Sequence, residues 1–148
     1  TGYEQYEISN FSKLGFRSRH NSSYWQGKPY YGLGPAAHSF NGLNKRRWNV
    51  SNHALYIQAI GKDIIPFEEE TLSDTQRLNE YVMTSLRTAE GLNIDYVKTT
   101  FGEENAERIL REAEKVLDNG KMIGNEAGLN LTPEGKFFAD GIAAELFS

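Results

Sequence analysis

Residues 103–120, EENAERILREAEKVLDNG, are the stretch of sequence that decides the fold. Their apolar side chains recur at intervals of three and four, which places them on one face of a helix. Glu103 and Glu104 lie at the positive end of the helix dipole, and Gly120 supplies a stop. The apolar positions are Ala106, Ile109, Leu110, Ala113, Val116 and Leu117. This pattern predicts an amphipathic helix whose stripe packs in a core.

A longer and a shorter helix are expected before this stretch. Residues 74–89 carry apolar side chains at helical spacing, follow a capping box that begins at Ser73, and end before Gly91. Their apolar positions are Leu78, Tyr81, Val82 and Leu86. Residues 94–101 predict the shorter helix. Together with residues 103–120 they predict a helical core.

The end of the chain adds a hairpin and a last helix. Residues 121–125 and 129–131 flank a turn with Gly128, which predicts two short strands. Thr132 is expected as an N-cap, with Pro133 at the first helical position. Phe138, Ile142 and Leu146 then recur four apart. The order helix, helix, two-stranded wing, helix resembles a winged-helix arrangement.

The first half of the chain gives weaker patterns. Residues 3–8 and 46–50 predict short strands, and residues 54–60 predict a short helix. Residues 30–39 contain glycines and a proline and predict a strand that runs into a close backbone approach. The acidic run at residues 68–70 is interpreted as linker charge. The expected fold class is α+β and mainly helical.

Composition excludes several kinds of site. A chain of 148 residues makes one ordinary domain or parts of two, and this one contains no cysteine. Disulfides, thiolate zinc sites, a cysteine nucleophile and cysteine-held iron–sulfur clusters are therefore excluded within it. Because Thr1 leads directly into a strand pattern, a truncated protein is expected. No apolar run approaches the roughly 20 residues that span a bilayer, so we expect a cytoplasmic protein, with membrane association left open.

Charge is distributed unevenly along the chain. Before Thr71 eight Lys or Arg face six Asp or Glu, and from there on eight face fourteen, so the two parts carry charges of +2 and −6. The first part also holds all three histidines and both tryptophans. The skew predicts one aromatic, polar unit and one acidic, helical unit.

The segment HNSSYW at residues 20–25 is the first candidate site. It combines an imidazole at His20, an amide at Asn21, and large flat rings at Tyr24 and Trp25. An imidazole ligates heme iron or moves protons near neutral pH, and aromatic faces suit a porphyrin plane. The alternative is a surface loop with packed aromatic rings, and composition alone does not separate the two.

A second candidate lies at the end of the glycine-containing stretch, where Gly32 and Gly34 precede His38. Gly-x-Gly without a third glycine and a following acidic residue is not a dinucleotide fingerprint, so a close-packed strand is the simpler interpretation. His53 lies in a polar segment and is expected in solvent.

Five basic residues of the first half are candidate anion-binding groups. Arginine offers a planar fork of donors to carboxylates and phosphates. A solvated basic face is the favoured interpretation. The residues are Arg17, Arg19, Lys45, Arg46 and Arg47.

The order of five short motifs resembles that of a known family. They are residues 6–11 (YEISNF), 20–25 (HNSSYW), 32–39 (GLGPAAHS), 86–92 (LRTAEGL) and 131–135 (LTPEG). The succession is similar to that of the HemW-type heme chaperones, which are related to the oxygen-independent coproporphyrinogen III oxidases among radical-SAM proteins. The resemblance spans nearly the whole chain, and its most specific parts are the HNxxYW and GLGPxAHS motifs.

The resemblance implies a two-part protein. A partial (β/α) barrel would carry S-adenosylmethionine and a [4Fe-4S] cluster on three cysteines, and a mostly helical domain would follow. Since this chain has no cysteine, it is expected to hold only the end of the barrel at residues 1–50, a linker with a short helix at 51–72, and the winged-helix-like domain at 73–148. No iron–sulfur ligand is assigned in it.

The resemblance also implies roles for particular residues. His20 is the candidate for heme contact or iron ligation, and Asn21, Tyr24 and Trp25 would shape its site. In the oxidase branch the positions that match His20, Asn21 and His38 lie near a second S-adenosylmethionine and the substrate. Heme or porphyrin binding is therefore expected at these residues, with Gly32 and Gly34 as cofactor contacts and no catalytic residue in this chain.

Three functions are open at this point. The leading hypothesis is a heme chaperone that delivers heme to an acceptor protein; the second is oxidative decarboxylation of coproporphyrinogen III to protoporphyrinogen IX. A winged-helix module on nucleic acid is disfavoured, because phosphate contacts need a positive surface and the second part carries −6. The strand at residues 3–8, with an uncovered edge, would allow a dimer.

Overall fold

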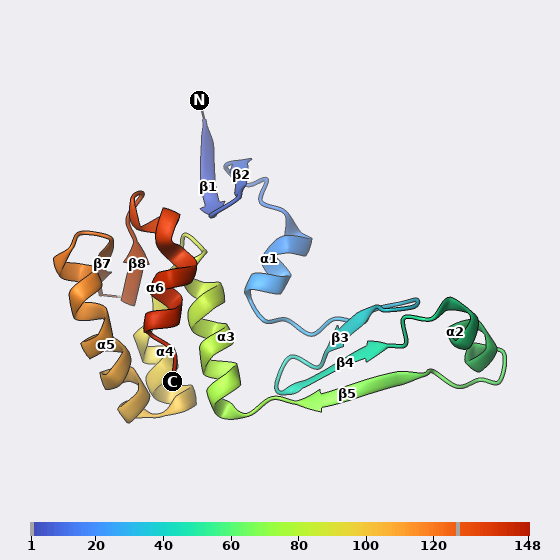
Figure 1. Ribbon diagram of the computed structural model, residues 1–148. Coiled ribbons are helices and arrows are strands. Elements are labelled where there is room, and N and C mark those ends of the chain that lie inside the picture. The colour runs from blue at the N-terminus through green and yellow to red at the C-terminus, as the bar shows by residue number, and fades with distance from the viewer. Residues whose placement is uncertain (1, 127) are drawn as a thin grey trace. The chain divides into compact units, whose positions relative to one another are not determined.

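The computed structural model describes residues 2–126 and 128–148 (Figure 1). They form two compact units. We call Thr1–Trp25 together with Asp74–Ser148 the helical unit, and Gln26–Ser73 the sheet unit. These units differ from the expected segments 1–50, 51–72 and 73–148, because residues 1–25 cluster with the C-terminal helices. Membership of residues 1–50 in a barrel stays a prediction.

The helical unit is built on α3 (Asp74–Leu86), α4 (Ile94–Phe101), α5 (Glu103–Asp118) and α6 (Ala139–Glu145), which Figure 1 shows grouped around one small sheet. The predicted helix at residues 103–120 is confirmed. Its buried stripe consists of Ala106, Ile109, Ala113 and Val116, whereas Leu110 faces solvent. The same core also contains Leu78, Val82, Leu86, Val97, Ile142 and Leu146.

Helix α3 ends three residues earlier than predicted. The amide of Ile8 donates to the carbonyl of Arg87 at 3.0 Å, and the amide of Ala89 donates to the carbonyl of Tyr6 at 3.1 Å. These bonds to the N-terminal strand replace further helical bonds. Helix α4 matches its predicted bounds, because the side chain of Asn93 caps it at the amide of Tyr96.

The predicted C-terminal hairpin is confirmed as β7 (Met122–Asn125) and β8 (Gly128–Leu131). It belongs to a sheet of order β6-β8-β7, whose β6 (Leu92–Asn93) was too short to predict. A Cβ on Gly128 would lie 1.9 Å from the carbonyl oxygen of Leu92, so this pairing requires glycine. The content of helix and sheet agrees with the expected mixed class, while the winged-helix assignment stays a prediction.

The last helix begins differently from the prediction. Thr132 does cap a turn, since its hydroxyl accepts from the amide of Gly135 at 3.1 Å, but that turn precedes the 3-10 helix η1 (Gly135–Phe138), and α6 follows η1. Ile142 and Leu146 are buried as expected. Phe138 is half exposed and lies under the ammonium group of Lys121.

Residues 1–25 contain more structure than predicted. Strand β1 (Tyr3–Glu7) is confirmed, and β2 (Asn10–Lys13) pairs with it in antiparallel fashion where a loop was expected. The short helix α1 (Arg19–Trp25) then carries the HNSSYW segment. One edge of β1 is therefore covered by β2, and its end is bridged to Thr88.

The sheet unit holds β3 (His38–Phe40), β4 (Lys45–Asn49) and β5 (Phe67–Thr71) in that order, all antiparallel, and the short helix α2 (His53–Ile60). The predictions of β4 and α2 are confirmed. The interpretation of the acidic run as a linker is wrong, because it forms β5. Its carboxylates pair across the strands, with Glu69 2.8 Å from Lys45 and Glu68 accepting from the indole of Trp48 at 3.2 Å.

A strand over residues 30–39 is not formed. Gly34 and Ala36 have φ angles of +100° and +57°, which break an extended backbone, and regular pairing starts only at His38. The expected close approach is nevertheless present, since a Cβ on Gly32 would lie 2.2 Å from the carbonyl oxygen of His38. In the portion of the chain that is described, no helix is long and apolar enough to cross a bilayer.

Candidate functional site

The HNSSYW segment places an imidazole and a phenol side by side at the surface. His20 and Tyr24 are one turn apart on α1, and their rings meet edge to face with centroids 5.0 Å apart. His20 is exposed, and among residues 2–126 and 128–148 no group forms a hydrogen bond to its ring. Such an imidazole has a lone pair available to a ligand.

The other two residues of the motif hold the helix in place. Asn21 donates from its side chain to Asn10 on β2 at 3.3 Å, and its amide donates to the hydroxyl of Ser18 at 3.2 Å. The ring of Trp25 lies under the guanidinium of Arg87, 5.7 Å from the ring centroid. Asn21 and Trp25 therefore fix α1 to the rest of the helical unit.

The indole nitrogen of Trp25 is an exception among the buried polar atoms. It is buried, yet no hydrogen-bond acceptor reaches it within the described part of the chain. A buried donor without a partner costs on the order of 1–3 kcal/mol. This nitrogen is therefore a candidate donor to a bound molecule or a water.

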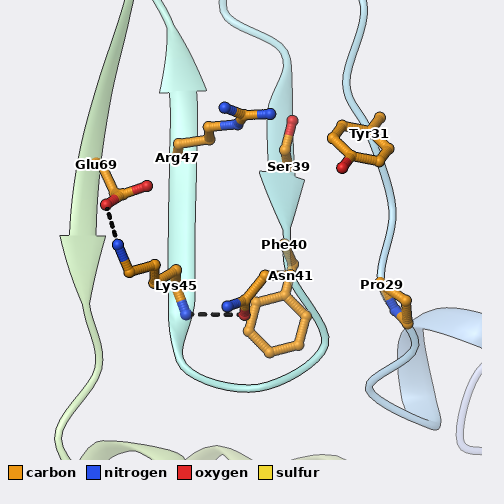
Figure 2. Close-up of a pocket in the computed structure, with 8 residues that line it drawn as sticks. All are labelled: Pro29, Tyr31, Ser39, Phe40, Asn41, Lys45, Arg47 and Glu69. Atoms are coloured by element: carbon orange, nitrogen blue, oxygen red, sulfur yellow. Dashed lines mark hydrogen bonds and ion pairs between the residues drawn. The ribbon is translucent and has the colours of Figure 1, made fainter.

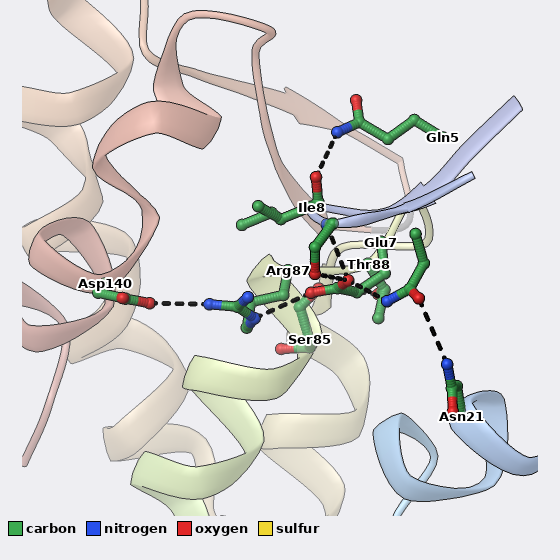
Figure 3. A network of polar contacts seen from close by, with 10 residues as sticks. Gln5, Glu7, Ile8, Asn21, Ser85, Arg87, Thr88 and Asp140 are labelled. Atoms are coloured by element: carbon green, nitrogen blue, oxygen red, sulfur yellow. Dashed lines mark hydrogen bonds and ion pairs between the residues drawn. The ribbon is translucent and has the colours of Figure 1, made fainter.

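Asn21 of α1 is joined through Asn10 to a network centred on the carboxylate of Glu7 (Figure 3). Glu7 is only 1% exposed, and it accepts from the amide and hydroxyl of Ser9 at 2.9 and 2.8 Å and from the side chain of Asn10 at 2.5 Å. Nε of Arg87 donates to its other oxygen at 3.0 Å. Burial raises the pKa of the Glu7 carboxyl, but the bonds from Ser9 and Asn10 and the charge of Arg87 outweigh it and hold that pKa below its usual range.

The network joins three of the motifs read in the sequence. Glu7 and Asn10 come from YEISNF, Asn21 comes from HNSSYW, and Arg87 comes from LRTAEGL. Arg87 also binds Asp140 on α6 at 3.0 Å. The sequence alone indicates no role for Glu7, Asn10 and Arg87, because no local signal links positions 80 residues apart. Their function in the structure is to support the helix that carries His20.

The remaining candidates lie in the sheet unit. His38 is exposed and faces Trp48 across the β3–β4 pair, with ring centroids 6.2 Å apart. The amide of Gly32 donates to the hydroxyl of Ser39 at 3.0 Å, and the carbonyl of Gly34 accepts from Asn49 at 2.9 Å. The backbone groups of these two glycines thus stabilise their own loop.

The candidates therefore fall into two groups. His20, Asn21, Tyr24 and Trp25 are brought together on α1, while Gly32, Gly34 and His38 belong to the other unit. A site that combines the two groups stays a prediction. In the described ranges no cluster of three or more His, Asp or Glu side chains has the arrangement of a metal site, and the sequence contains no cysteine.

The protein-family model described as the HemN C-terminal domain matches residues 72–138. This range covers most of the helical unit from α3 to η1.

Curated relatives match almost the full chain. "Heme chaperone HemW" of Mycobacterium tuberculosis (strain ATCC 25618 / H37Rv) is 32% identical over 98% of the chain, and that of Bacillus subtilis (strain 168) is 28% identical over 95%. "Radical S-adenosyl methionine domain-containing protein 1, mitochondrial" of Danio rerio is 28% identical over 96%. The chain spans only 35%, 37% and 34% of the length of these relatives.

A solved structure shares the fold. It is described as "Coproporphyrinogen III oxidase (HemN) from Escherichia coli is a Radical SAM enzyme", and it superposes with a TM-score of 0.71 over 99% of this chain and 37% of that one. Sequence identity is 16%, so the likeness concerns the fold alone.

Proposed function

Because the chain belongs to the family of HemW heme chaperones and HemN-like radical-SAM proteins, we propose that it is the heme-binding part of a heme chaperone. The full-length gene product would bind heme as cargo and deliver it to an acceptor protein. Relatives with this name match nearly all of the present sequence, but they are about three times longer. The activity of the whole protein is therefore part of the proposal.

The observation that carries the proposal is the arrangement of α1. His20 offers an exposed imidazole with no competing hydrogen bond among the described residues, and the ring of Tyr24 lies beside it. One histidine suffices as an axial ligand of heme iron, and an adjacent aromatic ring suits the porphyrin plane. A ligand on a single, firmly supported helix binds cargo and still leaves it open to an acceptor.

Each residue of the motif has a part in this proposal. His20 would coordinate the heme iron through its neutral ring, and Tyr24 would pack on the macrocycle. Asn21 and Trp25 would hold α1 through Asn10 and Arg87, and the free indole N–H of Trp25 would donate to the cargo. His38, Gly32 and Gly34 are proposed as contacts to porphyrin or S-adenosylmethionine from the sheet unit.

S-adenosylmethionine and a [4Fe-4S] cluster are proposed as cofactors of the full-length protein. The cluster does not fit this chain, because its ligands are cysteine thiolates and the sequence contains none. No step is therefore assigned to cluster chemistry at any residue here. The chain's own part is to bind heme, to orient it and to meet the acceptor.

Heme titration of the full-length gene product tests the role of His20. We expect His20→Ala to shift the Soret band and to weaken heme binding by at least about tenfold, as loss of a coordinating side chain would. His53→Ala is the matched control, because His53 is also exposed and starts α2 in the sheet unit. An unchanged Soret spectrum and affinity in the His20 variant would remove His20 from the ligand role.

A second function is oxygen-independent oxidation of coproporphyrinogen III. The matching domain model is named after HemN, which keeps this reaction open for the full-length protein. Incubation with coproporphyrinogen III under strict anaerobiosis, with an intact cluster, decides between them. Formation of the vinyl-bearing product would favour the oxidase, and its absence would leave the chaperone.

Four further expectations remain part of the proposal. They are a cytoplasmic location with membrane association left open, a heme-accepting protein partner, no binding to nucleic acid, and a dimer through β1. The dimer would have to use the side of β1 away from β2, around Tyr3–Gln5, because Glu7 is already bridged to Thr88.

A further inference from the structure

A pocket of about 270 Å³ lies on one face of the β3-β4-β5 sheet (Figure 2). Side chains alternate between the faces of a strand, so the odd-numbered residues of β3 and β4 share this face. The pocket is lined by Pro29, Tyr31, Ser39, Phe40, Asn41, Lys45, Arg47 and Glu69. All of these residues belong to the sheet unit.

Arg47 carries the unbalanced charge of this pocket. Its guanidinium lies over the ring of Tyr31 at 5.6 Å and over that of Phe67 at 4.9 Å. Glu69 stands directly opposite Arg47 in the strand register, but its carboxylate is bound by Lys45 at 2.8 Å. Within the described sequence no acceptor forms a hydrogen bond with Arg47, so its planar set of donors is available.

The other polar groups of the pocket also present donors. The side-chain oxygen of Asn41 already accepts the amides of Leu43, Asn44 and Lys45 at 2.9 to 3.0 Å, which leaves its NH₂ group available. The hydroxyl of Ser39 accepts from the amide of Gly32, which leaves its proton to donate. One positive charge and several donors therefore meet where the single acidic side chain in the lining is already neutralised.

The neighbouring arginine is in a different situation. Arg46 lies on the opposite face of β4 and pairs with Glu70 at 3.7 Å. A merely solvated basic face would give both arginines free, exposed side chains. Stacking between two rings instead holds the guanidinium of Arg47 in one orientation, which lowers the entropy cost of binding an anion.

We propose that this pocket binds a carboxylate of the protein's ligand through the guanidinium of Arg47, with Asn41 and Ser39 as flanking donors. A planar fork matches a carboxylate with two parallel hydrogen bonds. The choice of ligand rests on the proposed function: the carboxylate is a propionate of the porphyrin. The rings of Tyr31 and Phe40 offer apolar contacts to it. The methionyl carboxylate of S-adenosylmethionine presents the same chemistry and is distinguished by experiment.

The test titrates the full-length gene product with metal-free mesoporphyrin IX and with its dimethyl ester, followed by fluorescence. Removing iron separates this test from the role of His20. We expect the wild type to bind the diacid about tenfold more tightly than the ester, the size of one charge-assisted pair. Arg47→Gln should remove this preference and leave ester binding unchanged, and Arg47→Lys should keep part of it.

Arg46→Gln is the matched control, because it removes the same charge from the opposite face of the same strand. The porphyrin assignment would be overturned if the wild type bound diacid and ester with equal affinity. It would also be overturned if Arg47→Gln and Arg46→Gln lost affinity for the diacid equally. A parallel titration with S-adenosylmethionine then decides which ligand supplies the carboxylate. If affinity for S-adenosylmethionine falls in Arg47→Gln but not in Arg46→Gln, the pocket binds a carboxylate of the cofactor. No effect of Arg47→Gln on either ligand overturns the pocket.

The outcome also separates this inference from the proposed function. Heme binding that persists in Arg47→Gln with the same affinity leaves the chaperone proposal standing and removes the porphyrin assignment of the pocket. Failure of the wild type to bind any porphyrin removes the chaperone proposal. The S-adenosylmethionine titration still tests whether the pocket binds a carboxylate. Thermal unfolding of Arg47→Gln within a few degrees of the wild type shows that its fold is intact.

Discussion

The guanidinium of Arg87 binds the buried carboxylate of Glu7 at 3.0 Å, across 80 positions of the sequence. The pair ties the N-terminal strand to the end of α3. Arg87 also forms an ion pair with Asp140 on α6, and its guanidinium stacks on Trp25 of α1. One side chain therefore holds four elements of the helical unit.

Arg87→Ala should strongly destabilise the helical unit. It leaves the Glu7 carboxylate buried and without its countercharge, which typically costs about 3–5 kcal/mol. Urea unfolding followed by circular dichroism measures the loss. Asp140→Asn is the control, because that carboxylate is largely exposed and its removal should cost much less. Equal effects of the two variants would contradict the central role given to the Glu7 pair.

Stability should fall in acid partly because of Glu7. The folded pKa of Glu7 lies below the unfolded value of about 4.3, so its contribution is complete above that value and is lost as the pH falls through the folded pKa. Unfolding free energies measured from pH 7 to pH 3 should therefore decline less steeply in Glu7→Gln than in the wild type. Parallel curves would exclude Glu7 as a source of the acid sensitivity.

Gly128→Ala should disrupt the β6–β8 pair. Its Cβ would meet the Leu92 carbonyl at 1.9 Å, and its φ of +150° disfavours any other residue, so we expect a loss of at least about 2 kcal/mol. Gly141→Ala is the matched substitution inside α6, where a Cβ meets nothing within 4 Å. It should stabilise the protein by about 0.5–1 kcal/mol. Thermal unfolding of both variants checks the opposite signs.

Trp25→Phe should separate the two roles of Trp25. Phenylalanine keeps an aromatic ring under Arg87 and removes the buried N–H that has no partner in the described structure, so stability should be unchanged or rise by about 1 kcal/mol. If that N–H donates to the cargo, heme affinity should fall while stability does not. A variant that loses stability and keeps its affinity would show that the indole has a packing role only.

The sequence was most informative where a pattern is local. The apolar spacing in residues 103–120 predicted α5, and the helix predicted at residues 94–101 is α4, because each depends on side chains within four positions. The hairpin of β7 and β8 was predictable for the same reason, since one turn joins its strands.

Elements that depend on distant partners were missed. The acidic run forms β5 because its carboxylates pair with Lys45, Arg46 and Trp48. These three residues belong to β4, about twenty residues earlier in the sequence. Helix α1 is only seven residues long and largely polar, so its stability comes from Asn10 and Arg87 and not from its own pattern.

The same limit applies to the candidate site. The sequence singled out His20 and Trp25, and the structure adds the support beneath them. The pocket around Arg47 was not predicted, because a basic residue in a sequence carries no sign of whether its charge is balanced. Only the strand register shows that Glu69 is bound by Lys45 and not by Arg47.

The helical unit is discontinuous, since Gln26–Ser73 separates its two segments in the sequence. Its segments are joined by the Glu7–Arg87 ion pair and by the bonds of Ile8 and Ala89, none of which runs through the intervening chain. A single peptide-bond cut within Gln26–Ser73 would therefore yield two fragments that remain associated without a covalent link. Separately expressed halves of this kind would reconstitute the unit by fragment complementation.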